Sequence, residues 1–333
     1  MKNKQIIGLV VAGIVFVFVC ASSVLVNSFT SEIGGNSFFD LMGISSSEEG
    51  EFSFPANNFI AVVRVEGVIM ESETTSLFET ATYYHQNTLD YINALISNDA
   101  NKGIMLYVNS PGGTVTASDE LYLKLLEYKE ITNRPVYTYM ASEACSGGYY
   151  ISMASDYIMA NRNTWTGSIG VIISLTNYKE LYDKLGIKEI NITSGANKAM
   201  GSSGEDMTEE QKAILQSLVD ESYDQFVEIV ADGRNMEVSE VKEAADGRIF
   251  SAKQAKDQNL IDEVVLTYED AEGYVNDQVG PVVFHEPSNE ATDSLSYLFG
   301  KLADGMKSRS DAEVLAEFVE KQGSGVPMYY AKP

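Results

Sequence analysis

A buried strand and a glycine turn occupy residues 104–113, which read Ile104-Met105-Leu106-Tyr107-Val108-Asn109-Ser110-Pro111-Gly112-Gly113. The uninterrupted apolar run predicts a strand covered on both faces, and the Pro-Gly-Gly sequence predicts a sharp turn at its carboxyl end. Two glycines allow the backbone to turn and to direct N–H groups toward a ligand. Most turns of this kind are purely structural, so the stretch predicts a buried parallel strand and only a candidate site.

The chain on either side of this strand alternates between strand and helix patterns. Strands are predicted over 59–65, 136–140, 157–160 and 169–173, with one more before Ser194. Helices are predicted over 89–96, 118–128, 177–185 and 208–232, where apolar residues recur at helical spacing. Continuous apolar strands that alternate with helices indicate an α/β fold with a mostly parallel sheet and flanking helices.

Two further glycine turns follow predicted strands and carry serines. Ser146 lies in Ala144-Cys145-Ser146-Gly147-Gly148-Tyr149-Tyr150, and Ser168 in Thr166-Gly167-Ser168-Ile169-Gly170. A serine before a helix is usually an N-cap, but the same position places its hydroxyl at the positive end of the helix. A nucleophilic serine also needs a base, and a desolvated lysine can serve. Lys198, in Ser194-Gly195-Ala196-Asn197-Lys198, is the candidate, although most lysines are solvated surface charges.

Composition excludes several other functions. The 333 residues contain 23 Lys and Arg against 48 Asp and Glu, a net charge of −25 that argues against nucleic-acid binding. The two histidines, His85 and His285, are too few for a multi-histidine metal site, and both are expected in packing or surface roles. The two cysteines, Cys20 and Cys145, cannot form a disulfide framework. No metal and no cofactor is expected.

The N-terminus predicts a membrane anchor. The run from Ile6 to Val26 is apolar and uncharged, long enough to cross a bilayer, and is preceded by Lys2 and Lys4. This pattern predicts a cytoplasmic N-terminus and an extracytoplasmic remainder; a cleaved signal peptide is the competing interpretation. The predicted organisation is an anchor over 1–27, an acidic linker over 28–57, the main domain over 58–285 and a C-terminal extension over 286–333.

Taken together and in order, these motifs resemble those of the SppA-type signal peptide peptidases. The resemblance extends to a later segment, Asp246-Gly247-Arg248-Ile249-Phe250-Ser251-Ala252-Lys253-Gln254-Ala255, and to Asn259-Leu260-Ile261-Asp262. It covers roughly residues 58–265 and, with the anchor, is similar to the short, single-copy bacterial form. The family implies a ClpP/crotonase-like fold and a serine endopeptidase with a Ser–Lys dyad.

Motif positions assign the roles that the resemblance implies. Ser146 would be the nucleophile, Lys198 the general base and Ser168 the residue that orients the lysine. The amide of Gly113, with that of Gly147, would form the oxyanion hole. Cys145 departs from the family pattern, in which alanine is expected there, and it is interpreted as a packing residue.

The family also implies substrates and partners: hydrophobic peptides such as signal peptide remnants, the cell membrane, and a homo-oligomeric ring with active sites at subunit boundaries. Two alternatives of the same fold are an acyl-CoA enzyme and a non-catalytic membrane protein. The first would be cytosolic and would not need Ser146 and Lys198. The second would be favoured only if one of those two motifs were degenerate.

The C-terminus carries a separate prediction. Residues 311–321 have the pattern of an amphipathic helix, and residues 323–325 form a Gly-Ser-Gly hinge before the apolar segment 326–333. A flexible hinge before an extended apolar peptide predicts a strand that could occupy a substrate cleft. A frayed terminus is the alternative.

Overall fold

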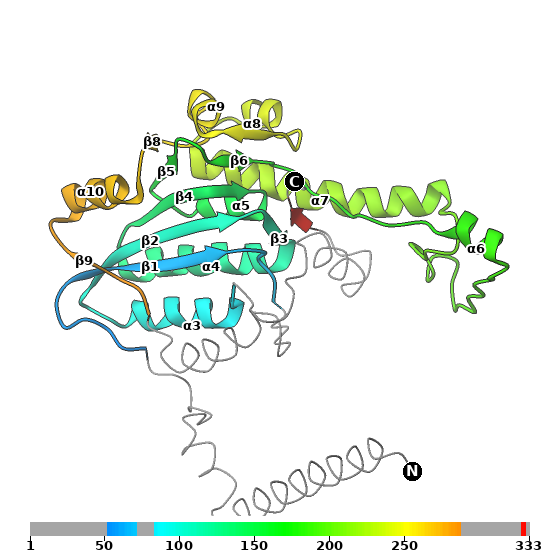
Figure 1. Cartoon of the computed structure of the whole chain (residues 1–333), viewed down its shortest axis with the longest axis horizontal. Coiled ribbons are helices and arrows are strands. Elements are labelled where there is room, and N and C mark those ends of the chain that lie inside the picture. The colour runs from blue at the N-terminus through cyan, green and yellow to red at the C-terminus, as the bar shows by residue number, and fades with distance from the viewer. Residues whose placement is uncertain (1–51, 72–82, 288–327, 331–333) are drawn as a thin grey trace, which may run out of the picture. The chain divides into compact units, whose positions relative to one another are not determined.

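The apolar run of residues 104–108 lies in β2 (Asn101–Ser110), in the middle of the main sheet (Figure 1). The computed structural model of the protein describes residues 52–71, 83–287 and 328–330. The other strands of the sheet are β1 (Phe59–Glu66), β4 (Val136–Cys145), β5 (Tyr157–Asn161), β6 (Trp165–Gly167), β7 (Ile249–Ser251), β8 (Glu263–Val265) and β9 (Val283–His285).

The strands run in the order β7-β6-β4-β2-β1-β9, with β5 beside β4 and β8 beside β5. All of these pairs are parallel except β6 with β7. The predicted mixed α/β fold with a mostly parallel sheet and flanking helices is therefore confirmed. The helices of the body are α3 (His85–Ile96), α4 (Val115–Thr132), α5 (Gly147–Ser152), α8 (Val238–Ala244), α9 (Ala252–Asp257) and α10 (Tyr268–Val279).

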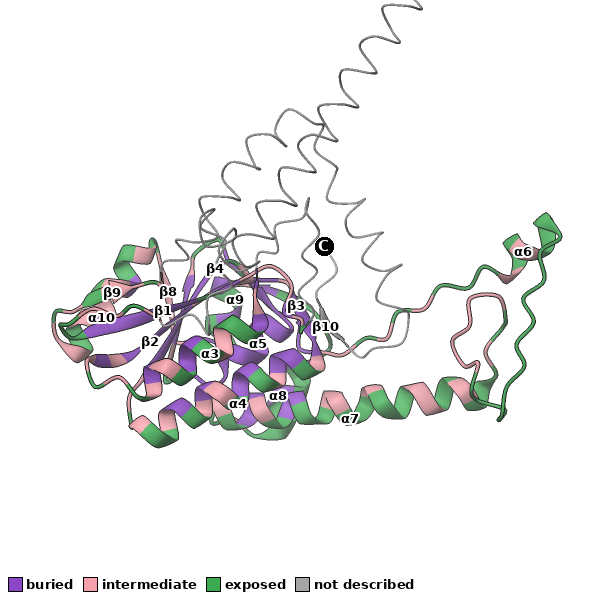
Figure 2. Ribbon diagram, turned by 90° about the horizontal axis from the view of Figure 1, so that it is seen from below, coloured by how far each residue is buried: buried purple, intermediate pink, exposed green. Residues whose placement is uncertain are grey.

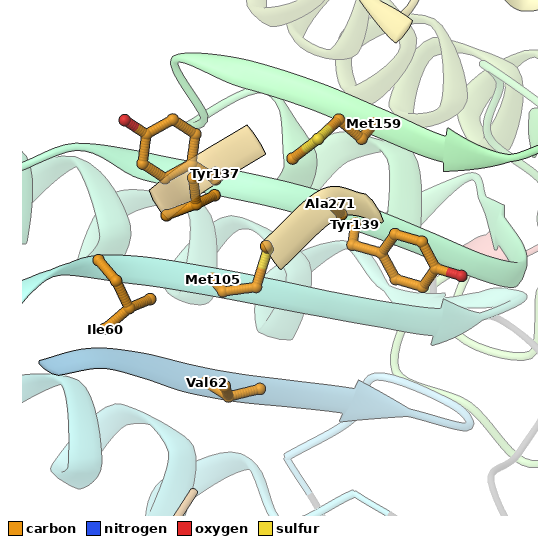
Figure 3. Packing of buried hydrophobic residues seen from close by; sticks show 8 residues of the cluster. Ile60, Val62, Met105, Tyr137, Tyr139, Met159 and Ala271 are labelled. Atoms are coloured by element: carbon orange, nitrogen blue, oxygen red, sulfur yellow. The ribbon is translucent and has the colours of Figure 1, made fainter. Parts of the chain in front are cut away.

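Successive side chains of a strand point to opposite faces of the sheet. Because the strands carry apolar residues on both faces, helices cover both of them. On one face, residues from four strands pack against α10, as Figure 3 shows; the cluster consists of Ile60, Val62, Met105, Tyr137, Tyr139 and Met159, with Ala271 and Val275 from the helix. Ala61 and Val63 point to the opposite face and are equally buried, on the side where α3 contacts β1 and α4. The continuous burial of β1 follows from this double cover.

A short strand, β3 (Gly112–Thr114), follows β2 and leaves the main sheet. Gly113 of β3 forms a bridge with Ile69, and the strand β10 (Met328–Tyr330) pairs with β3 in antiparallel orientation. The strand predicted in the C-terminal tail is therefore confirmed, although its hinge and the helix predicted over 311–321 lie outside the described residues.

The strand predicted over 169–173 is wrong, because the pairing with β4 ends earlier, at Gly167. Gly167 and Ser168 have φ angles of 79° and 51°, so the backbone turns out of the extended conformation just before the apolar run begins. The strand predicted before Ser194 is also absent, since residues 186–208 contain no strand.

Residues 171–225 form a long projection that we call the arm. It contains α6 (Lys179–Leu185) and the first two thirds of α7 (Glu209–Arg234). None of its residues is buried, whereas Phe226, the next residue of α7, is completely buried. Figures 1 and 2 show α6 and its loops at the end of α7 that lies away from the sheet. The apolar side chains of the arm therefore join no core in the described part of the chain.

The membrane anchor predicted over 1–27 and most of the predicted linker, 28–51, lie outside the described residues. Within the described ranges, no helix combines the length and the apolar character needed to cross a bilayer.

Candidate active site

Ser146 occupies a strained turn between β4 and α5. Its φ and ψ angles are 52° and −115°, a conformation that a residue with a side chain rarely adopts. Two backbone hydrogen bonds fix the turn: Ser146 N–H donates to Gly167 O at 2.8 Å, and Tyr150 N–H donates to Ser146 O at 2.8 Å. The serine therefore stands at the N-terminal, positive end of α5, where developing negative charge is favoured.

The Ser146 hydroxyl is buried and has no hydrogen-bond partner among the described residues. Leaving a buried hydroxyl without a partner costs about 1–3 kcal/mol, so such groups in folded proteins call for a functional explanation. Strain in the backbone and an unused hydroxyl at the same residue both favour a chemical role over the N-cap role. No side-chain capping bond is present at Ser146.

Gly147 is a glycine because nothing larger fits. A Cβ at this position would lie 2.4 Å from Ser118 Oγ and 3.1 Å from the amide nitrogen of Gly113. The backbone that follows Ser146 is thus in contact with the turn at the start of β3. The structure brings together three of the residues that the sequence selected, Ser146, Gly147 and Gly113.

Gly113 lies between two neighbouring backbones. On one edge of β3, Ile69 N–H donates to Gly112 O at 2.9 Å and Thr114 N–H donates to Ile69 O at 2.8 Å. Successive residues of a strand point their backbone polar groups to opposite edges, so the N–H and C=O of Gly113 face the other edge. Tyr329 of β10 is paired with Gly113 on that edge. An extended peptide therefore lies directly against the amide expected to form the oxyanion hole.

Ser168 borders the same region from β6. Its N–H donates to Arg248 O at 2.8 Å, and its own φ of 51° turns the chain out of the strand. It immediately follows Gly167, whose carbonyl holds the Ser146 turn. Ser168 also lines a cavity of about 500 Å³ at the root of the arm, together with Val171, Tyr223 and Asp246. The Arg248 guanidinium lowers the pKa of the Asp246 carboxyl to about 2, so the carboxylate on this wall of the cavity is charged and forms an ion pair with Arg248.

Lys198 is the one predicted site residue that the structure leaves apart from the rest within this chain. It is exposed and lies on the arm, and its backbone N–H donates to Gly195 O at 3.2 Å. Ser146, by contrast, is buried between β4 and α5. In the described part of the chain, Ser146 Oγ makes no hydrogen bond to Lys198.

Cys145, next to the candidate nucleophile, is only 1% exposed. Burial, and secondarily the charge of Glu143, raise the pKa of its thiol to about 12. A thiol that keeps its proton is a poor nucleophile, because the thiolate is the reactive form. Cys145 is therefore a packing residue, as predicted, and Ser146 is the better candidate of the two.

The histidines lie elsewhere. His85 bonds to Tyr83 OH at 2.8 Å and to Glu120 at 2.9 Å, while His285 bonds to the carbonyl of Ser53 at 2.9 Å. Neither contacts a candidate site residue through these bonds. Among the described residues, no group of three or more His, Cys, Asp or Glu side chains could hold a metal ion.

Ser118 is the residue near the site that sequence reasoning missed. It belongs to α4 and is completely buried, and its Oγ lies where the Cβ of a larger residue at position 147 would collide with it. A serine in the first turns of a helix is common, so only its burial and its contact with Gly147 single it out.

Comparison with known proteins agrees with this geometry. The model of peptidase family S49 matches residues 129–279, and that of the Clp proteases matches residues 70–174. The chain is 38% identical over 282 residues to a putative signal peptide peptidase SppA of Enterococcus faecium, covering 83% of this chain and 81% of that protein.

Two other relatives align with this chain over shorter segments. A putative protease of Synechocystis is 44% identical over 50% of this chain and 60% of its own length. The chloroplastic serine protease SPPA of Arabidopsis thaliana is 28% identical over 71% of this chain and 36% of its own length. The turn that holds Ser146 and the later segment near Asp246 both lie inside the S49 match. The chain therefore belongs to peptidase family S49, as a serine protease of the SppA type.

Proposed function

We propose that this protein is a membrane-anchored endopeptidase that cleaves apolar peptides, with Ser146 as nucleophile and Lys198 as general base. The observation that carries the proposal is the pairing of β10 with β3. In this pairing the edge carrying Gly113 holds an extended peptide, near a strained serine whose hydroxyl has no hydrogen-bond partner among the described residues. An endopeptidase needs this combination of a strand-binding edge and an adjacent nucleophile.

The proposed chemistry balances without a metal or cofactor. Neutral Lys198 takes the proton of Ser146 Oγ as this oxygen bonds to the peptide carbonyl carbon. The carbonyl oxygen becomes an oxyanion that accepts hydrogen bonds from the amides of Gly113 and Gly147, each donor contributing about 3–4 kcal/mol. The Lys198 ammonium then protonates the departing amine. Water, deprotonated by the same lysine, releases the acyl group from Ser146.

We infer that the lysine comes from a neighbouring copy of the chain. The arm that carries Lys198 has no buried residue, and several of its large apolar side chains are strongly exposed: Leu181, Leu185, Ile187, Ile190 and Ile192. Burying these side chains against a second copy would remove a large apolar area from water. The cavity beside Ser168 would admit the neighbour's Lys198 loop, and Ser168 would then orient the incoming amine.

The same arrangement fits an apolar peptide substrate at a membrane. Residues 6–26 would hold the catalytic domain on the extracytoplasmic side, next to the signal peptide remnants left in the bilayer. A ring of copies joined through their arms would enclose the sites and exclude large folded proteins. Backbone pairing with β3 makes few demands on sequence, as the removal of varied peptides requires.

The test is active-site labelling of the full chain in detergent. A fluorophosphonate probe should modify Ser146, as identified by mass spectrometry, in the wild type and in Cys145→Ala. Ser146→Ala should remain unlabelled and should not cleave a fluorogenic hydrophobic peptide. Labelling at another residue, or hydrolysis by Ser146→Ala, would refute the assignment.

A further inference from the structure

We propose that Ser118 supplies a third hydrogen-bond donor to the oxyanion, an inference that rests on the proposed role of Ser146. Ser118 is the fourth residue of α4 and is completely buried. In the described part of the chain, three buried side-chain polar atoms have no hydrogen-bond partner: Tyr268 OH and the hydroxyls of Ser118 and Ser146. Tyr268 lies among aromatic rings on the α10 side of the sheet. Ser118 lies on α4, Ser146 immediately precedes α5, and these two helices contact each other.

One point in space relates Ser118 to the proposed oxyanion hole. The position that a Gly147 Cβ would take is 2.4 Å from Ser118 Oγ and 3.1 Å from the Gly113 nitrogen. The Ser118 hydroxyl is therefore next to both residues whose amides are expected to bind the oxyanion. The strand β10 contacts α4 and α5 as well as β3, so a substrate held in its place would lie over the same hydroxyl.

A buried serine with no partner is hard to explain by stability. Alanine has the higher helix propensity and leaves no polar atom unsatisfied. Serine hydroxyls within helices usually bond to the carbonyl four residues earlier, which for Ser118 would be that of Thr114, but Ser118 Oγ makes no such bond. The neighbouring Ala117 shows that alanine is compatible with this part of the helix. The hydroxyl is explained if its acceptor arrives with the substrate.

The substrate carbonyl oxygen becomes a strong hydrogen-bond acceptor when the tetrahedral intermediate forms. When Ser146 Oγ bonds to the carbonyl carbon, the electron pair of the C=O bond moves to oxygen, and negative charge appears beside Gly113 N–H. The Ser118 O–H donates a hydrogen bond to that oxygen and transfers no proton. A donor used mainly in the transition state raises kcat and leaves KM nearly unchanged.

The experiment compares Ser118→Ala with Ser152→Ala in the full-length protein. Ser152 is an equally buried serine on α5, but its hydroxyl donates to Gly148 O at 2.8 Å. Ser118→Ala should lower kcat about 100-fold with KM within about twofold, and should weaken a hydrophobic peptide aldehyde, which mimics the tetrahedral state, by the same factor. Its Tm should equal or exceed that of the wild type. Ser152→Ala should show the reverse, a lower Tm with kcat within about twofold.

Wild-type kcat and wild-type aldehyde affinity in Ser118→Ala would overturn the proposal. A lower kcat that comes with a lower Tm and unchanged aldehyde affinity would overturn it too, because the serine would then act through packing. If Ser118→Ala does not fold, Ser118→Cys, a weaker donor of similar shape, decides by the same measurements. Ser146→Ala is assayed in parallel: activity in that variant refutes the proposed function, whereas inactivity there leaves the Ser118 result to be interpreted alone.

Discussion

Ser146 and Gly147 have backbone requirements that their side chains do not reveal. Ser146 holds a φ of 52°, and Gly147 leaves its Cβ position to Ser118 Oγ and the Gly113 amide. Strain of this kind persists where the surrounding structure fixes it, here through the bonds to Gly167 and from Tyr150. Geometry thus requires a glycine at position 147, and it holds Ser146 in a conformation that a side chain disfavours.

Gly147→Ala should lower kcat about 100-fold, because its methyl group would collide with Ser118 Oγ and press against the Gly113 amide. The measurement is hydrolysis of a fluorogenic hydrophobic peptide, with circular dichroism to verify folding. A matched control is Gly273→Ala on α10, where an added Cβ meets no atom within 4 Å. Wild-type kcat in Gly147→Ala would contradict the geometry described for the oxyanion hole.

Cys145 carries a pH-dependent contribution to stability. The pKa of its thiol is about 12 in the folded chain against an ordinary 9.0. Since the folded state holds this proton to a higher pH than the unfolded state, the stabilisation is complete below about pH 9 and is lost as the pH rises toward 12. Relative to Cys145→Ala, the wild type should lose up to about 1.4 kcal/mol of unfolding free energy per pH unit in that window.

Urea unfolding of both proteins near neutral pH and near pH 10 measures this loss. Cys145→Ala should also hydrolyse peptide at close to the wild-type rate. A stability difference that stays constant with pH would mean that the thiol is not shielded from water, and an inactive Cys145→Ala would reopen the choice of nucleophile.

At this scale the sequence motifs selected several residues that the structure places near one another, while their catalytic roles stay a prediction. Ser146, Gly113 and Ser168 lie in glycine turns whose order is distinctive, and the structure brings their backbones together. Ser118 could not be predicted, because the sequence of α4 does not distinguish a buried serine without a hydrogen-bond partner from an exposed helical serine. Its identification needs the distance to Gly147, which depends on how α4 and α5 pack.

Among the elements, the short strand β3 contacts a neighbouring backbone on each of its two edges. One edge of this three-residue strand is held by Ile69, and the other accepts β10. The C-terminal tail and a substrate would compete for that second edge, since the polar groups of Gly113 can serve only one strand at a time.

Deleting residues 323–333 should therefore raise the rate of hydrolysis at low substrate concentration, by several-fold, and lower the apparent KM. A peptide with the sequence of residues 326–333, added back to the shortened protein, should inhibit it competitively. An unchanged rate after deletion, or a peptide that does not compete, would show that the tail is only a terminus that rests on β3.

Strands and helices of the body were predictable for a simple reason. Buried parallel strands such as β2 are continuous apolar runs, and amphipathic helices repeat at helical spacing. The strand predicted over 169–173 failed because an apolar run alone cannot reveal that Gly167 and Ser168 turn the backbone out of the sheet. Ile169 of this run is buried and Ile172 is exposed, so the apolar pattern alone did not separate a turn into the arm from a core strand.

At the scale of the whole molecule, the arm separates Lys198 from Ser146. Residues 171–225 carry exposed leucines and isoleucines that the described residues of the chain leave unburied. The arm joins the body at Phe226, whose ring centroid lies 5.0 Å from that of Tyr150 on α5, the helix that follows Ser146. Gln225 donates to the Tyr150 hydroxyl at 2.8 Å, and this hydroxyl donates to Asp119 at 2.6 Å. The root of the arm is thus fixed to the element that holds Ser146, which would give a docked neighbour a rigid reference.

Complementation between inactive variants tests the shared dyad most directly. Ser146→Ala and Lys198→Ala, each inactive alone, are unfolded together in equal amounts and reassembled, with different tags to verify that mixed assemblies form. In a ring where every site takes Ser146 from one copy and Lys198 from the next, random mixing restores about a quarter of the sites. We expect hydrolysis of a fluorogenic hydrophobic peptide at about a quarter of the wild-type rate. Verified mixed assemblies with no activity would show that the two residues do not meet across a subunit boundary.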